Sequence, residues 1–239
     1  YEIRNDYDAA MSWVNKVSSG PNFLEAKILG AQFTAKHQTV DKALTLLDSY
    51  NSIDINEKLI ILKTKASLLL SNDRGEDAYE LMKNEDNNFK DSAEFKFDYA
   101  VLSEKMGNTL LMEQLLTEAI KLKPDYAVAY NALGYSYADR NINLDVAKRN
   151  IEIALSIQPK NHYILDSMGW VYYRLGNNKI ALEFLRKAYA AQEDPEIAAH
   201  LGEVLWKMKE KEKASKIWQS SLRSNPNNKV LLDTIDKFR

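Results

Sequence analysis

The sequence lacks cysteine and is poor in the two residues that tight turns use most. Its 239 residues include 8 glycines, 5 prolines and no cysteine. The absence of cysteine excludes disulfides, thiolate nucleophiles and cysteine-ligated zinc. Because strands joined by tight turns need more glycine and proline, this composition, rich in Leu, Ala, Lys and Glu, predicts helices.

The net charge is also small, and long apolar runs are absent. A net charge of −2 argues against a protein that holds nucleic acid through bulk electrostatics. No apolar run approaches the ~20 residues needed to cross a bilayer. The chain begins at Tyr1 without a signal-like segment, so we expect a trimmed chain or mature fragment that continued upstream.

The sequence repeats itself at intervals of 33 to 35 residues. Three similar stretches, AYNALGYSYADRN, ILDSMGWVYYRLGN and AAHLGEVLWKMKE, carry Gly134, Gly169 and Gly202 in register. Further small residues follow each glycine, and we predict close helix packing at all these places: Gly134, Gly169, Gly202, Ala147, Ala181, Ala214, Ala154 and Ala188. Ser221 takes the last place in the third stretch, and prolines close the units at positions 124, 159 and 226.

The same frame extends backwards through Ala31, Ala66 and Ala100. It predicts a single array with an orphan helix of a preceding repeat at 1–20 and a capping helix at 229–239. Between them we predict six units at 24–58, 59–92, 93–126, 127–161, 162–194 and 195–228. In each unit apolar residues recur at three- and four-residue spacing, which predicts two amphipathic helices. A lone hairpin cannot bury both apolar faces, so the units are expected to stack.

These landmarks resemble the tetratricopeptide repeat, which has a 34-residue period with small residues and a closing proline. The resemblance implies an all-α fold, an α-solenoid in which helix–turn–helix units form a right-handed superhelix. Gly169 is then interpreted as a packing residue; a hinge or a ligand contact is the alternative.

Motifs for chemistry are missing. His37, His162 and His200 lie in different units, without metal-ligand spacing, and no phosphate-binding or nucleophile motif occurs. His200 and Glu203 are interpreted as an ordinary pair on one helix. We therefore predict no enzyme activity, no metal and no cofactor.

In the family, the first helices of the units line a concave groove that binds peptides. Carried over, the resemblance assigns the groove to Asn131, Tyr135, Asp139, Asp166, Trp170, Tyr173, Arg174, His200, Glu203, Trp206 and Lys207. Trp170 and Trp206 are either exposed in the groove or covered by the next unit. The first three units place Ile28, Gln32, Lys63, Ser67, Phe97 and Val101 there, a less aromatic set. Carboxylate-clamp repeats of the family carry Lys and, four positions later, Asn on the first helix of a unit. That pattern is absent here, because Ser67 stands four positions after Lys63 and Tyr135 stands four positions after Asn131.

The sequence thus predicts a protein-binding scaffold or adaptor that takes a peptide or helix of a partner. The stretches LDSMGWVYYRLGN and DPEIAAHLGEVLW also resemble the C-terminal repeats of Gram-negative envelope lipoproteins, which gather a protease and cell-wall hydrolases. That resemblance implies a periplasmic location, a possible lipid anchor upstream and a bacterial source. A helical-repeat RNA-binding protein is the alternative, and self-assembly through the repeats is left open.

Overall fold

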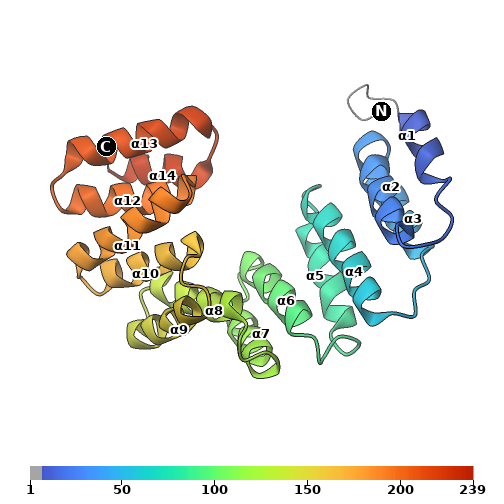
Figure 1. Cartoon of the computed structure of the whole chain (residues 1–239), viewed down its shortest axis with the longest axis horizontal. Coiled ribbons are helices and arrows are strands. Elements are labelled where there is room, and N and C mark those ends of the chain that lie inside the picture. The colour runs from blue at the N-terminus through green and yellow to red at the C-terminus, as the bar shows by residue number, and fades with distance from the viewer. Residues whose placement is uncertain (1–6, 239) are drawn as a thin grey trace. The chain divides into compact units, whose positions relative to one another are not determined.

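The computed structural model describes residues 7–238, which form fourteen helices and no strand (Figure 1). The first helix of each successive pair is α2 (Phe23–His37), α4 (Ile55–Leu70), α6 (Ala93–Lys105), α8 (Ala127–Asp139), α10 (His162–Arg174) and α12 (Pro195–Lys207). The second helices are α3 (Val40–Asp48), α5 (Gly75–Glu85), α7 (Thr109–Leu122), α9 (Leu144–Ile157), α11 (Asn178–Ala191) and α13 (Lys211–Ser224). Helix α1 (Tyr7–Val14) precedes them and α14 (Lys229–Lys237) follows. The all-α prediction is confirmed for these residues.

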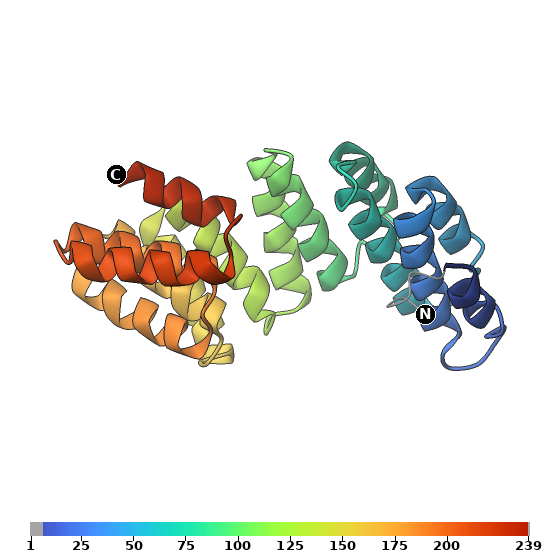
Figure 2. The same cartoon turned by 90° about the horizontal axis from the view of Figure 1, so that it is seen from above.

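The chain divides into two compact units, Tyr1–Glu118 and Ala119–Arg239, here called unit 1 and unit 2. Within unit 2, α8 packs on α9, α10 on α11 and α12 on α13, and the first helices α8, α10 and α12 also contact one another in order. Helix α14, which leads to the end marked C in Figure 2, packs mainly on α12. Each pair therefore buries its apolar faces against the next pair, as expected of a solenoid.

Polar caps mark the start of two first helices of unit 2, α10 and α12. The Asn161 side chain accepts from the backbone N–H groups of Tyr163 and Ile164 at the start of α10. Asp194 does the same for α12, where Pro195 occupies the first turn. A proline is favourable there because its missing N–H has no partner in a helix. A single capping residue thus defines the start of each of these two helices.

The core consists of the small residues at which helices approach, surrounded by larger aliphatic and aromatic side chains. Ala147, Ala154, Ala181, Ala188 and Ala214 are each 0% exposed. Leu185 and Val204 are equally buried. The turn inside the α10–α11 pair uses Gly176, whose φ of +81° is accessible to glycine at little cost.

One predicted boundary differs from the helix that the structure shows. Helix α4 begins at Ile55, inside the range 24–58 assigned to the first repeat. Asp54 explains this early start, because its carboxylate accepts from the N–H groups of Asn56 and Glu57 and so caps the helix. The orphan helix is also short, ending at Val14.

Candidate functional site

The first helices of unit 2 carry the predicted groove residues, and their spacing depends on glycine. A Cβ on Gly169 would lie 2.6 Å from Leu185 Cγ and 3.1 Å from the Ala181 carbonyl oxygen. A Cβ on Gly202 would lie 2.6 Å from Trp218 Cδ1, and one on Gly134 would lie 2.8 Å from the Ala147 oxygen. The structure therefore places all three glycines at close contacts between paired helices.

A buried ion pair joins α10 to α12. His200 Nδ1 lies 3.0 Å and 2.9 Å from the two carboxylate oxygens of Asp166. Both side chains are buried, with 7% and 6% of the residue exposed. Burial lowers the pKa of His200, but the Asp166 carboxylate outweighs it, so the pKa is raised. The negative charges of Glu196 and Glu203 act in the same direction.

Trp170 is covered rather than open. Its ring stacks on His200, with centroids 4.1 Å apart and planes inclined by 21°. The Arg174 guanidinium lies over the ring, 5.5 Å from its centroid, and Tyr173 packs at 5.1 Å. Only 5% of Trp170 is exposed. The indole thus acts as the centre of a packed aromatic and cationic cluster.

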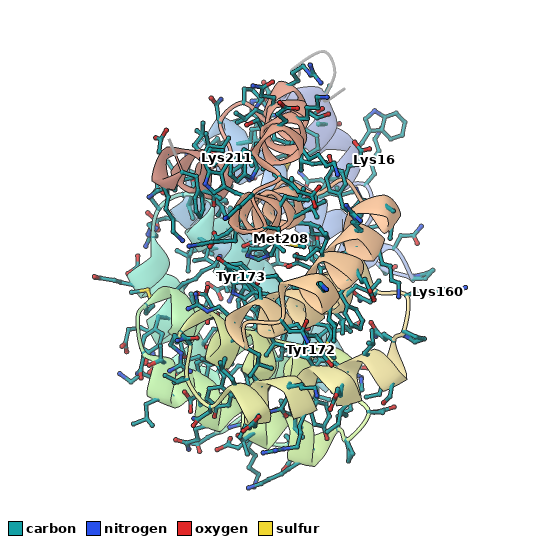
Figure 3. All side chains as sticks on the ribbon, turned by 90° about the vertical axis from the view of Figure 1, so that its left-hand side faces the viewer. Lys16, Lys160, Tyr172, Tyr173, Met208 and Lys211 are labelled. Carbon is teal, nitrogen blue, oxygen red and sulfur yellow. The ribbon has the colours of Figure 1, made fainter. Side chains whose placement is uncertain are left out.

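A second polar contact at this surface centres on Glu203, which is buried. Tyr173 donates its hydroxyl to Glu203 Oε1 at 2.9 Å, and Lys237 Nζ from α14 lies 3.3 Å from the same oxygen. Burial and the nearby Glu203 charge raise the pKa of Tyr173 well above its ordinary value. Figure 3 labels Tyr173 beside Tyr172, which stacks on Phe184 instead. Two adjacent tyrosines therefore serve different contacts.

The remaining predicted residues lie around this cluster. Arg174 donates to the backbone oxygens of Ala138 and Asp139 at 3.0 Å and 2.6 Å, which ties α10 to the end of α8. Tyr135 packs against His200 at 6.1 Å, and Asn131 is half-buried. Trp206 is half-buried between Trp218 and Phe238, whereas Asp139 and Lys207 are exposed.

The structure therefore separates the predicted groove set into two groups. Asp166, Trp170, His200 and Glu203 are buried by contacts within unit 2 and offer no free side chain to a ligand. This answers the question of Trp170: His200 of α12 covers it together with Tyr173 and Arg174 of α10. The other seven keep at least part of their surface, and their role in binding stays a prediction.

The corresponding helices of unit 1 leave a hollow. A cavity of about 290 Å³ lies against α4 and α6, with Met82 of α5 contributing to its wall. Its apolar lining includes Ala66, Leu70, Phe97, Val101 and Leu102, and its polar lining is Lys63, Ser67, Asp98 and Lys105. Lys63 Nζ pairs with Asp98 at 2.7 Å, and both side chains keep solvent access. Lys63, Ser67, Phe97 and Val101 are among the positions that the sequence placed on the concave surface.

The polar pairs follow a rule that the sequence analysis missed. Their partners are one repeat apart: 34 residues for Asp166 and His200, and 34 residues for Glu203 and Lys237. We interpreted His200 and Glu203 as a pair on one helix, but His200 bonds to Asp166 of the preceding first helix. Opposite charges separated by one repeat length were the signal that could have identified these contacts.

Among residues 7–238, no three His, Asp or Glu side chains gather as a metal site. No helix in the described range is long and apolar enough to span a membrane. The arrangement can bind and orient a partner through apolar and charged side chains.

Comparisons with known proteins agree with the repeat architecture. A family model described as tetratricopeptide repeat matches residues 163–195. A TPR repeat-containing protein of Pseudomonas aeruginosa is 33% identical over 202 residues, which covers 84% of this chain and 34% of that protein. The chain therefore spans about a third of the length of this curated relative.

Solved structures show the same fold. A tetratricopeptide repeat protein from Parabacteroides merdae aligns over 96% of this chain and 90% of its own, with a TM-score of 0.71 and 16% identity. A thermophilic TPR protein from Thermus thermophilus aligns over 72% of this chain and 93% of its own, with a TM-score of 0.63 and 21% identity. At these identities the likeness establishes the fold.

Proposed function

Because the chain is a tetratricopeptide-repeat protein, we propose that it is a non-catalytic adaptor that binds a partner segment along its first helices. The fold supports a protein-interaction scaffold in general. Stacked repeats present extended surfaces made by several helices, and such surfaces suit a peptide or helix of another protein.

The observation that carries this proposal is the cavity on α4 and α6. Its volume of about 290 Å³ lies near the lower end of the range for ligand pockets, at roughly 300–1,000 Å³. An apolar floor with a few charged groups at the edge can bury an anchor side chain and orient its backbone. Lys63, Asp98 and Lys105 supply both signs of charge for that orientation.

The test is to block the cavity without disturbing the core. Ser67 lines the cavity and is exposed, so Ser67→Arg fills the opening while its charged end reaches water. Ser156→Arg is the matched control, because Ser156 is exposed on the second helix α9. Cross-linked partners would be captured from the source organism with wild type and both variants.

We expect Ser67→Arg to reduce capture of the main partner at least tenfold, with Ser156→Arg unchanged and far-UV circular dichroism helical for all. Equal capture by all three proteins would place the binding surface elsewhere and overturn the proposal.

We also propose that the adaptor works in a bacterial envelope assembly with a protease or cell-wall hydrolases. The support is the sequence resemblance of 165–177 and 194–206 to envelope lipoproteins and the bacterial origin of the relative. Cell fractionation of the source bacterium would show the full-length protein in the periplasmic or outer-membrane fraction. Recovery with cytosolic markers would contradict this location.

A further inference from the structure

Unit 2 contains a second cleft, which opens between two second helices and over the first helix α12. It has a volume of about 340 Å³ and lies between α11 and α13, with α12 as its floor. Leu201, Leu205, Ile217, Tyr189 and Ala190 form its apolar lining. The charged side chains that line it are all cationic: Arg186, Lys213 and Lys216.

The repeat register shows why the cleft is hollow. One repeat earlier, Phe184 and Tyr172 occupy the places of Ile217 and Leu205. Phe184 stacks on Tyr172, with ring centroids 5.8 Å apart and planes inclined by 10°. Two aromatic rings fill that place, whereas two smaller aliphatic side chains leave space between α11 and α13.

The charge changes at the same register. The places of Arg186 and Lys216 are held one repeat earlier by Glu152 and Glu183. Lys213 is paired with Glu210. Neighbouring carboxylates include Glu210, whose charge interacts with Arg186, and Glu193 beside Tyr189. Glu183 and Glu212 lie one helical turn before Arg186 and Lys216 on the same helices. In the part of the chain that the structure describes, Arg186 and Lys216 form no ion pair, so their charges remain available at the rim.

We propose that this cleft is a second docking surface that binds an acidic amphipathic segment of a protein partner. A large apolar side chain enters the cleft, and Asp or Glu residues on either side of it meet Arg186 and Lys216. Complementary charge favours such a segment and increases its association rate. A hollow between two helices takes an inserted side chain, which a flat lipid surface does not supply. This surface goes beyond the proposed function, because it lies on other helices and in the other unit.

A random twelve-residue peptide display library, selected on the wild-type chain, tests the proposal. Synthetic versions of the enriched peptides are then titrated by fluorescence anisotropy against five proteins: the wild type, two cleft variants, a charge control and the Ser67→Arg variant of unit 1. The charge-swapped variant Arg186→Glu with Lys216→Glu copies the preceding repeat, and Ile217→Phe copies its filled place. The control, Lys160→Glu with Lys179→Glu, changes net charge equally at exposed sites of unit 2 (Lys160 is labelled in Figure 3).

We expect enriched peptides that combine a large apolar residue with Asp or Glu. The charge swap and Ile217→Phe should each weaken binding more than tenfold, the control less than threefold, and added salt should weaken it further. Peptides without an acidic excess, or peptides that both cleft variants bind normally, would overturn the proposal. A selection that enriches no peptide would also overturn the proposal. The same holds if the wild-type chain binds anionic vesicles and only the charge swap abolishes that binding. Peptides lost only in Ser67→Arg would overturn it while supporting the adaptor function in unit 1.

Discussion

The first helices of the two units use the same register position in opposite ways. The residue after the recurring small position is Ser67 or Val101 in α4 and α6, but Tyr135 or Trp170 in α8 and α10. In unit 1 the smaller side chains leave a cavity, and Lys63 and Asp98 remain in contact with solvent. In unit 2 the large rings bury a charged pair. At this position α4 and α6 thus carry small side chains beside a cavity, whereas α8 and α10 carry rings that fill the surface.

This difference has an energetic side. An exposed ion pair contributes little to stability, whereas removing one partner of a buried pair leaves a charge without compensation. Aromatic side chains that suit peptide anchoring also suit packing against a neighbouring helix. In unit 2 the ring of Trp170 is buried against neighbouring side chains, whereas in unit 1 the cavity on α4 and α6 can still admit a side chain.

The largest expected effect separates the two ion pairs. Asp166→Ala should lower the free energy of unfolding by about 3 kcal/mol, because it leaves His200 buried without its carboxylate. Asp98→Ala should cost less than about 1 kcal/mol, since Lys63 is already half in water. Urea unfolding measures both losses of stability. Circular dichroism follows the helices of both units, and tryptophan fluorescence reports mainly on unit 2, which holds three of the four tryptophans. Equal losses would remove the distinction between the units.

A second comparison concerns glycine contacts. Gly202→Ala should cost about 2 kcal/mol, because its Cβ meets the ring of Trp218, which is buried and cannot easily shift. Gly30→Ala in unit 1 should change stability by less than about 1 kcal/mol, since better helix propensity offsets the contacts of the new Cβ with a methyl of Val14 at the end of α1 and with the side-chain end of Leu46. Thermal denaturation gives the order. A larger loss for Gly30→Ala would contradict it.

The pH dependence of unit 2 should follow His200. Its folded pKa is raised, so its pair with Asp166 contributes fully below the unfolded value of about 6.5 and is lost as pH rises through the folded pKa. The melting temperature reported by tryptophan fluorescence should therefore fall as the pH is raised through that window. His200→Gln should flatten this part of the profile. A wild-type profile that rises with pH would contradict the assignment.

The smallest expected effect is on the cavity of unit 1. Ser67→Trp places an indole where α10 carries Trp170, and most of the new ring should lie in the existing space. Stability should change by less than about 0.5 kcal/mol, as for most substitutions at exposed positions. Calorimetry measures it. A loss of several kcal/mol would show that the cavity is too rigid to admit a side chain.

The repeat register made most of the fold predictable. Small residues at fixed spacing indicated where helices approach. The early start of α4 was missed because Asp54 lies in a linker whose capping role depends on backbone conformation. Burial at Trp170 was not decidable from one helix, because it depends on His200 of the next first helix and on how Arg174 turns.

The one-repeat spacing of the polar pairs has a consequence for rearrangement of the gene. An array of similar modules tolerates duplication or loss of a module when every junction is interchangeable. Here Asp166 pairs with His200, and Glu203 pairs with Lys237, so the two junctions use different charged partners. Removing the α10–α11 pair would leave His200 without its carboxylate and Glu203 without the Tyr173 hydroxyl. Charge therefore distinguishes these two junctions of unit 2 from each other.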